Sequence, residues 1–227
     1  AAAREIVEDM PHRAAAELAA FRAMILSRAA ARVAARDAVP AELRSATGTN
    51  SVEALRVETP HAGFFRTRRY HLCHPRFDGT QSPVLQREVF VATDAALVLP
   101  YDPLRDRVLL IEQFRMGPYG RGDPRPWMLE PVAGRIDAGE TPEETALREC
   151  REEAHLDLRG LEKISTHYCT PGYSTEVFHL FLGLCDLPDD TPGRGGLETE
   201  NEDIRTHVIG FDRATALLRS GEANNGP

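Results

Sequence analysis

The chain contains few cysteines, and their spacing fits neither a zinc site nor a disulfide framework. Its 227 residues include 4 cysteines, which are Cys73, Cys150, Cys169 and Cys185, with no CxxC pair among them. Structural zinc sites use closely spaced Cys and His ligands, and small disulfide-stabilised secreted domains are denser in cysteine. We therefore expect reduced free thiols and a cytoplasmic location.

Long apolar runs and an excess of positive charge are also lacking. No stretch reaches the ~18 apolar residues of a membrane helix, and arginines interrupt the Ala-rich N-terminal stretch. The net charge of −8 argues against a basic face for nucleic acid or anionic lipid. What remains is a globular chain, 42% hydrophobic and long enough to bury a core, in which an anionic substrate would need local cations or a metal.

The order of predicted elements favours an α/β fold. Residues 11–36 carry apolar side chains at helical spacing and predict one amphipathic helix, while residues 63–77 and 84–92 predict a β-hairpin around a turn at Asp78 and Gly79. From Ala95 onward, short apolar strands alternate with helices, which predicts an α/β/α sandwich with a mixed sheet. The predicted strands are 96–99, 108–113, 164–168, 177–184 and 206–209, and a helix is predicted at 213–219. We also expect Trp127 in the core.

Three parts follow from this order of elements. They are an N-terminal helical extension at residues 1–47, a β subdomain at 48–94, and the α/β domain at 95–227. The helical extension is predicted to be an appendage of the core domain.

One segment, from Gly134 to Leu156, concentrates the charged residues that can carry chemistry. Within it, Thr141 is a favoured N-cap, Pro142 falls at the first helical position and Glu144 can complete a capping box, so a helix is predicted to begin there.

Three glutamates of this helix, Glu149, Glu152 and Glu153, are spaced i, i+3 and i+4 and share one face. Carboxylates so close repel each other, and a hard divalent cation with oxygen ligands, Mg²⁺ or Mn²⁺, relieves that repulsion. Arg148 can pair with Glu140 or orient one carboxylate. The alternative interpretation is an acidic helix face that water solvates.

The same segment resembles the Nudix box. The family pattern is G-x5-E-x7-R-E-U-x-E-E-x-G-U, in which U is aliphatic, and Gly134, Glu140 and the run from Arg148 to Glu153 fit its spacing. This resemblance implies the Nudix α/β/α sandwich.

Two positions of the box depart from the family pattern. Cys150 stands at an aliphatic position, which is a mild change because free cysteine behaves as a small hydrophobe. His155 stands where the family has glycine, so we expect a strained or remodelled helix end. We interpret His155 as a surface turn residue; a metal ligand is the less favoured alternative.

Further segments resemble the bacterial ADP-ribose pyrophosphatases from Glu58 to the end of the chain. They are GFF at 63–65, QREVF at 86–90, LPYDPLRDRVLLIEQFR at 99–115 and LETENEDIRTHVI at 197–209. Pro171 lies fifteen positions after Leu156, close to the place of a proline typical of that subfamily. The tellurite-resistance branch, whose members often carry an additional N-terminal domain, looks most similar.

This resemblance implies a set of metal ligands and catalytic residues. The carbonyl of Ala133 with Glu149 and Glu153 would bind Mg²⁺, and Glu152 would hold a metal or a metal-bound water. In the loop that follows the glycines at 193–196, Glu200 would be the general base and Glu202 a further metal ligand. Arg148 joins Glu200 and Glu152 as a catalytic residue. An ordinary acidic surface loop is the alternative for Glu200 and Glu202.

The resemblance also implies substrate contacts. Arg115 would clamp the diphosphate, or else form a structural ion pair with Glu112 or Glu130. Phe64 and Arg87 would sandwich adenine, the arginine coming from the partner of a homodimer, although an aromatic on a strand is more often a core residue. Glu88 and Glu176 complete the predicted substrate-binding set.

The function implied is Mg²⁺-dependent hydrolysis of the diphosphate of ADP-ribose to AMP and ribose 5-phosphate. Another nucleoside diphosphate sugar, such as GDP-mannose or ADP-glucose, is an alternative substrate. A catalytically silent Nudix module that senses a ligand is a further alternative, although such modules tend to lose the box carboxylates, which this chain retains.

Overall fold

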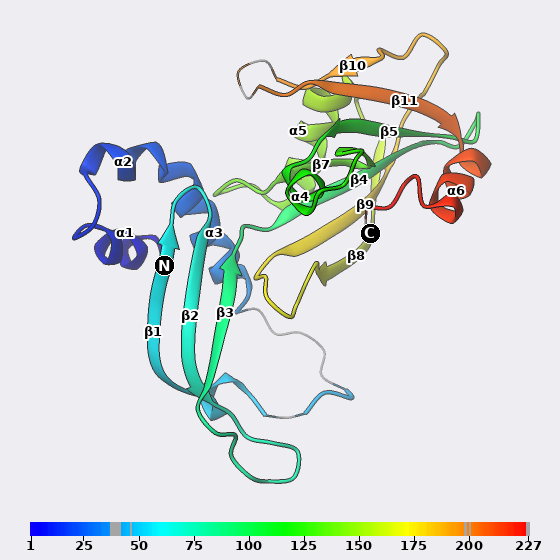
Figure 1. Cartoon of the computed structure of the whole chain (residues 1–227). Coiled ribbons are helices and arrows are strands. Elements are labelled where there is room, and N and C mark those ends of the chain that lie inside the picture. The colour runs from blue at the N-terminus through cyan, green and yellow to red at the C-terminus, as the bar shows by residue number, and fades with distance from the viewer. Residues whose placement is uncertain (37–41, 46, 198, 200, 226–227) are drawn as a thin grey trace. The chain divides into compact units, whose positions relative to one another are not determined.

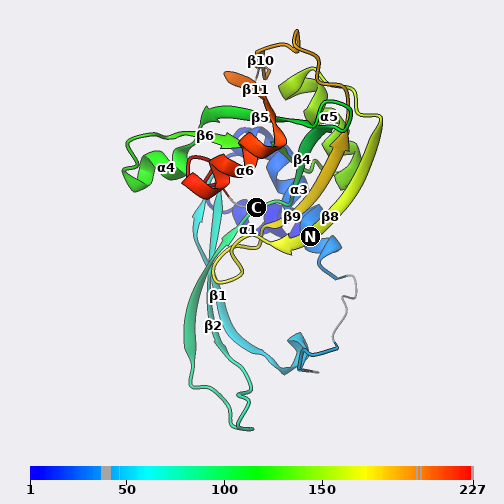
Figure 2. The ribbon, with the colours of Figure 1, turned by 90° about the vertical axis from the view of Figure 1, so that its right-hand side faces the viewer.

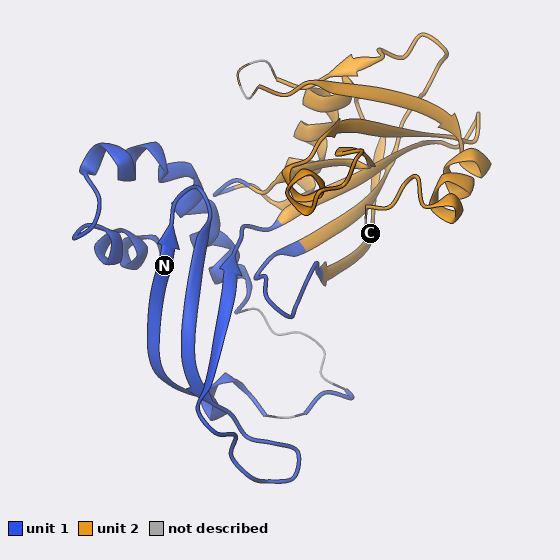
Figure 3. Ribbon diagram, viewed as in Figure 1, with its two compact units in different colours: residues 1–94, 137–139, 168–177 blue, residues 95–136, 140–167, 178–227 orange. Residues whose placement is uncertain are grey.

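The chain forms two compact units. The computed structural model describes residues 1–36, 42–45, 47–197, 199 and 201–225 (Figure 1). Unit 1 consists of residues 1–94, 137–139 and 168–177, and unit 2 of residues 95–136, 140–167 and 178–227 (Figure 3). The division into domains at 1–47, 48–94 and 95–227 stays a prediction; residues 1–94 lie together in unit 1.

A mixed sheet forms the body of unit 2, as predicted. Its strands follow the order β10-β11-β5-β4-β9-β8, with β6 paired to β5 and β7 paired to β4. Strands β4 and β9 run parallel, whereas β4 and β5 run antiparallel. The strands are β4 (Ala95–Asp102), β5 (Arg107–Phe114), β6 (Trp127–Glu130), β7 (Val132–Arg135), β8 (Gly160–Tyr168), β9 (Val177–Leu184), β10 (Arg194–Gly195) and β11 (Ile204–Gly210). All five predicted strands are present, four of them longer than predicted.

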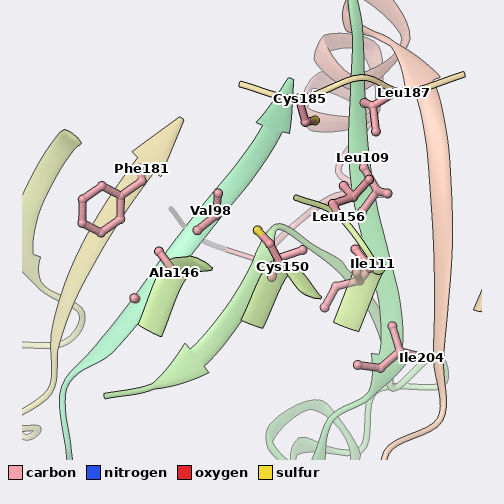
Figure 4. Close-up of a cluster of buried hydrophobic side chains, with 13 residues drawn as sticks. Val98, Leu109, Ile111, Ala146, Cys150, Leu156, Phe181, Cys185, Leu187 and Ile204 are labelled. Atoms are coloured by element: carbon pink, nitrogen blue, oxygen red, sulfur yellow. The ribbon is translucent and has the colours of Figure 1, made fainter. Parts of the chain in front are cut away.

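Helices lie on both faces of this sheet. The strand residues Val98, Leu109 and Ile111 are buried in one cluster with Ala146 and Cys150 of α5 (Pro142–Ala154), as Figure 4 shows. Because side chains alternate between the faces of a strand, Tyr101 lies on the opposite face from Val98. There its ring contacts that of Phe211, the first residue of α6 (Phe211–Ser220). Figure 2 shows α5 to one side of β4 and α6 to the other, which is the predicted sandwich.

The start and end of α5 both follow from local chemistry. The hydroxyl of Thr141 accepts from the Glu144 backbone N–H at 3.2 Å, and the Glu144 carboxylate accepts from the Thr141 N–H at 2.8 Å, so the predicted capping box is present. At the other end, His155 adopts φ 55° and ψ 35°, the left-handed conformation that glycine takes at lower cost. His155 is exposed, in agreement with a surface turn. The helix end is therefore strained at one residue while its hydrogen bonds are complete.

Two helices occupy residues 11–36, where a single helix was predicted, and a third helix precedes them. They are α1 (Ala2–Asp9), α2 (Ala15–Ala20) and α3 (Arg22–Ala34). The backbone leaves helical geometry at Phe21, over whose ring the Arg13 guanidinium lies at 5.2 Å. Met24 and Ile25 of α3 are buried. The prediction of one continuous helix was wrong because the Ala-rich sequence is compatible with helix throughout, whereas side-chain contacts set the break.

A three-stranded antiparallel sheet completes unit 1. It has the order β1-β2-β3 and consists of β1 (Glu53–Ala62), β2 (Arg66–Cys73) and β3 (Leu85–Val91), with a short 3₁₀ helix at Thr49–Ser51 before it. The predicted hairpin is confirmed as β2 and β3, and Gly79 of its turn has φ 83°. Strand β1 was not predicted. Its alternation is poor and Pro60 interrupts it, at a place where the pairing with β2 is irregular.

Candidate active site

The carboxylates of α5 are organised around one arginine. Arg148 donates from Nε to Glu140 Oε1 at 2.9 Å, and from Nη1 to Glu149 Oε1 at 2.6 Å and to Glu152 Oε2 at 2.9 Å. Its Nη2 donates to Glu140 Oε2 at 3.0 Å and to the Arg135 carbonyl at 3.3 Å. Both alternatives considered for Arg148 thus hold at once, since the side chain pairs with Glu140 and also orients two carboxylates. The acidic residues of the helix are not simply a solvated face.

Glu149 and Glu153 are buried against β7. Glu153 is 2% exposed, and its Oε2 accepts from the Ala133 backbone N–H at 3.0 Å. A Cβ placed on Gly134 would lie 1.8 Å from Oε1 of Glu149, so the glycine leaves the space that this carboxylate occupies. Burial raises the pKa of Glu149 to about 7, against the opposing pull of Arg148, and raises the pKa of Glu153 to about 8. Both carboxylates are therefore costly to keep ionised without a further cation.

Arg115 and Glu202 lie within electrostatic range of this cluster. Arg115 forms an ion pair with Glu130, with Nε at 2.9 Å from both carboxylate oxygens and Nη2 at 2.5 Å from Oε2. Burial opposes the charge of Arg115, but Glu130 and the nearby carboxylates of Glu153 and Glu202 raise the pKa of its guanidinium. Of the two ion pairs considered for Arg115, the one with Glu130 is present, while Glu112 pairs with His207 and Arg205.

The chain after β9 returns to the C-terminal end of α5. The Gly196 backbone N–H donates to the Glu152 carbonyl at 3.0 Å, and a Cβ on Gly195 would lie 1.7 Å from the Glu153 carbonyl oxygen, so β10 can approach the helix this closely only with glycine. Glu202 accepts from the Leu197 N–H at 3.1 Å. The predicted general base, Glu200, lies outside the described residues.

The remaining predicted site residues belong to unit 1. Phe64 lies in the turn between β1 and β2 and is 49% exposed, so it is not a core residue. Arg87 and Glu88 are exposed on β3, where Glu88 accepts from Arg69 at 2.9 Å. In the segment 168–177, burial first and Asp94 second raise the pKa of Glu176. The structure thus brings Arg148, Glu149, Glu152, Glu153, Ala133, Arg115 and Glu202 together within unit 2, and their roles and those of the unit 1 residues stay predictions.

The donor set of unit 2 fits a hard divalent cation. Its groups are carboxylate and carbonyl oxygens, which Mg²⁺ and Mn²⁺ prefer, and burial disfavours the ionised form of two of the carboxylates. Among the described residues, no three Asp, Glu, His or Cys side chains already surround a point suited to a metal ion. One oxygen of each of the three carboxylates accepts a hydrogen bond, those of Glu149 and Glu152 from Arg148 and that of Glu153 from the Ala133 N–H.

Some residues of the site escaped the sequence analysis. Glu130 was considered only as a structural partner of Arg115, yet it is 3% exposed beside the carboxylate cluster. The short β6, which carries Glu130, and β7 were not predicted because each has four residues and Pro131 separates them. Trp127 of β6 is 58% exposed and packs edge-on against Phe114, so its predicted core position was wrong. Helix α4 (Met116–Arg121), which holds two glycines and a proline, was missed as well.

Comparison with known proteins agrees with the fold and with the site. Residues 91–225 match the model of the NUDIX domain. The ADP-ribose pyrophosphatase of Escherichia coli (strain K12) is 38% identical over 186 residues, which are 82% of this chain and 88% of that protein. The chain therefore belongs to the Nudix family, whose ADP-ribose pyrophosphatases generally depend on a divalent metal.

Two further similarities bear on substrate and fold. The GDP-mannose pyrophosphatase of Yersinia enterocolitica is 30% identical over 175 residues, or 77% of this chain and 90% of that protein. A crystal structure of an ADP compounds hydrolase aligns with a TM-score of 0.56 at 19% identity, covering 79% of this chain and 89% of that one, and this likeness concerns the fold alone. Of the helices in the described part of the chain, none has the length and apolar character needed to span a bilayer.

Proposed function

We propose that this protein is a divalent-metal-dependent pyrophosphatase that hydrolyses ADP-ribose to AMP and ribose 5-phosphate. The single observation that carries the proposal is the cluster of buried carboxylates on α5, which Arg148 orders and which Gly134 leaves room for. The similarity to the ADP-ribose pyrophosphatase over most of both chains supports the substrate.

The metal is proposed to be Mg²⁺, with Mn²⁺ as a substitute. The Ala133 carbonyl, Glu149, Glu152, Glu153 and Glu202 would hold it. Bound there, it would supply charge neutralisation for the diphosphate and acidify water for the attack on phosphorus.

The chain's own residues would position the reacting groups. Arg148 holds Glu149 and Glu152 by their oxygens, which limits the freedom of both carboxylates. Arg115 would exchange its contact with Glu130 for the phosphate oxygens of the substrate, because a guanidinium meets either partner bidentately. Glu200 is proposed as the base that takes the proton of the attacking water. One water molecule is consumed for each anhydride bond that is broken.

The substrate's base would bind to residues of unit 1. Phe64 presents a half-exposed ring in a turn, as a stacking residue would, and Arg87 is exposed on β3. Glu88 and Glu176 are proposed as further substrate contacts. A homodimer, in which Arg87 comes from the partner, a cytoplasmic location and a place in the tellurite-resistance branch all remain proposals from the sequence.

GDP-mannose is the second candidate substrate. The similarity to the GDP-mannose pyrophosphatase over most of that protein favours it, and the same carboxylate cluster can serve any nucleoside diphosphate sugar. Competition among ADP-ribose, ADP-glucose, GDP-mannose and NADH, compared by kcat/KM, decides between them.

The proposal is tested with Glu153→Gln, and with Glu143→Gln as the matched control on an exposed position of the same helix. In Mg²⁺ we expect Glu153→Gln to lower kcat by roughly 10²-fold or more, while Glu143→Gln leaves it unchanged. Melting temperature measured with Mg²⁺ and with EDTA gives a second readout, and we expect Mg²⁺ to stabilise the control but not Glu153→Gln. Full turnover by a folded Glu153→Gln protein, or binding of ADP-ribose in Mg²⁺ without hydrolysis by the unsubstituted protein, would contradict the proposal.

A further inference from the structure

We propose that the N-terminal helices hold the substrate turn in place, and that Arg28 of α3 is the positioning residue for Phe64. This inference rests on the proposed function, because it takes Phe64 as the residue that stacks on the substrate's base. It assigns a role to the N-terminal helices, for which the family resemblance implies none.

The turn at residues 63–65 exposes Phe64 and has few bonds of its own. The Gly63 N–H donates to the Phe65 carbonyl at 2.7 Å, which closes the turn. The Phe64 ring lies edge-on to that of Phe65, with centroids 5.0 Å apart, and Phe65 in turn contacts Phe90 of β3. No carboxylate or hydroxyl within the turn itself fixes the Phe64 backbone. A bond from outside the turn to the Phe64 carbonyl therefore adds a constraint that the turn does not provide itself.

Arg28 supplies that bond from outside the turn. Its Nη1 donates to the Phe64 carbonyl oxygen at 3.1 Å, although the two residues are 36 positions apart in the chain. Arg28 is 5% exposed, and its Nε donates to Glu5 Oε1 of α1 at 3.1 Å, while Nη2 pairs with the same oxygen. The guanidinium is thus held by α1 through Nε and Nη2, and its third nitrogen, Nη1, donates to the turn.

Further buried ion pairs join α1 to the strand that follows the turn. Arg66, the first residue of β2, is 1% exposed and donates to both oxygens of Asp9, at 2.9 Å and 2.8 Å. These bonds hold α1 against the start of β2, directly after the turn. Glu5 of the same helix binds Arg28, which in turn binds the Phe64 carbonyl. On the same helix as Arg28, the Ser27 hydroxyl donates to Asp137 Oδ1 at 3.4 Å, in the loop before α5.

A contribution to folding stability does not by itself explain why a buried arginine occupies position 28. A buried guanidinium carries a large desolvation cost, and well-packed apolar residues of similar size often stabilise a protein as much or more. An arginine at position 28 is explained if its function is to hold a particular backbone carbonyl. A hydrogen bond from a charged donor is worth about tenfold in an equilibrium constant, which sets the size of the expected effect.

The test compares Arg28→Met with Arg68→Met. Arg68 is equally buried, lies on β2 and pairs with Glu8 at 3.1 Å, so its loss perturbs the same ion-pair network without touching the turn. We expect both variants to melt at lower temperature. Only Arg28→Met should raise KM for ADP-ribose, by about five- to tenfold, with kcat within about twofold. Arg28→Lys, which keeps the charge beside Glu5, should show a smaller rise and stands in if Arg28→Met fails to fold.

Calorimetry with AMP and with ribose 5-phosphate separates this inference from the proposed function, because binding needs no turnover. We expect Arg28→Met to weaken AMP binding by the same factor and to leave ribose 5-phosphate, which has no base, unchanged. The positioning role is overturned if folded Arg28→Met or Arg28→Lys binds AMP as tightly as the unsubstituted protein. It is also overturned if Arg68→Met loses as much AMP affinity as Arg28→Met. If the unsubstituted protein binds AMP but does not cleave ADP-ribose, the proposed function fails, while the weaker AMP binding of Arg28→Met would still support the positioning role.

Discussion

Replacing Gly134 by alanine tests the site with the smallest change that the structure offers. The new Cβ would lie 1.8 Å from Oε1, 2.0 Å from Cδ and 2.4 Å from Cγ of Glu149. Gly134 does not have positive φ, so alanine suits its backbone, and the three atoms nearest to the new Cβ all belong to the Glu149 side chain. The substitution therefore moves one proposed ligand and leaves the strand intact.

The expected effect can be worked out from these distances. To move from 1.8 Å to the 3.4 Å of ordinary contact, the Glu149 carboxylate must shift by about 1.6 Å or adopt another rotamer, and it then loses the 2.6 Å bond from Arg148. A misplacement of about 1 Å at a catalytic centre can cost roughly 10²-fold in rate. We expect kcat/KM to fall by at least about that factor, together with a weaker apparent affinity for the activating metal.

The assay is steady-state hydrolysis of ADP-ribose over a Mg²⁺ titration, with melting temperature as the check on folding. Gly160→Ala is the matched control, since Gly160 also lies in a strand of unit 2 and a Cβ there would meet Leu184 at an ordinary 3.4 Å. We expect the control to keep wild-type kinetics. If Gly134→Ala keeps wild-type kcat/KM and wild-type metal dependence, then Glu149 does not act from the position described, and the proposed ligand set is wrong.

Two further predictions concern stability. Asp102 is fully buried, and the N–H of Leu187, with further bonds from Arg105 and Leu104, holds the pKa of its carboxyl well below the usual 3.8. A carboxyl whose pKa is lower in the folded state stabilises above its unfolded pKa and loses that contribution as the pH falls further. Asp102→Asn should therefore cost about 3 kcal/mol at pH 7, and this cost should begin to fall only below pH 4 and be clearly smaller near pH 2. Urea unfolding that shows an equal cost at pH 7 and pH 2 contradicts this. His155→Gly should raise the free energy of unfolding by about 1 kcal/mol, because glycine adopts positive φ without steric cost. The same variant should keep kcat, and a loss of stability would refute the strain at the helix end.

The sequence predicts those parts of the fold whose signals are local. The cap at Thr141 and the apolar strands of unit 2 need no knowledge of their neighbours, and both are confirmed. The break at Phe21 interrupts a sequence of continuous helix propensity, and β1 forms by pairing with β2 despite a weak strand pattern. Propensity alone therefore could not have placed them.

The alternation of side chains along a strand bears on the choice between Glu112 and Glu130 as the ion-pair partner of Arg115. Side chains three positions apart on a strand point to opposite faces, so Glu112 and Arg115 cannot share a face if the extended backbone continues to Arg115, whose φ is −124° and ψ 128°. The register then pairs Glu130 with Ile111, which is on the same face as Arg115. The alternation of side chains excludes Glu112 once the strand is known to extend to Arg115, whereas the choice of Glu130 requires the register of β5 and β6.

The charges around the site in unit 2, like the burial of its glutamates, favour binding of divalent cations. Among the described residues, six carboxylates lie around the site, those of Glu130, Glu140, Glu149, Glu152, Glu153 and Glu202, and two guanidinium groups, those of Arg115 and Arg148, lie among them. If all are ionised, four negative charges are left over, as many as two divalent cations neutralise. Without such cations, protonation of Glu149 and Glu153 would reduce the charge; burial raises the pKa of both carboxyls, and the neighbouring glutamates add to the shift. The proposed cation would neutralise this charge and would therefore stabilise unit 2, so metal removal should lower the melting temperature as well as the rate.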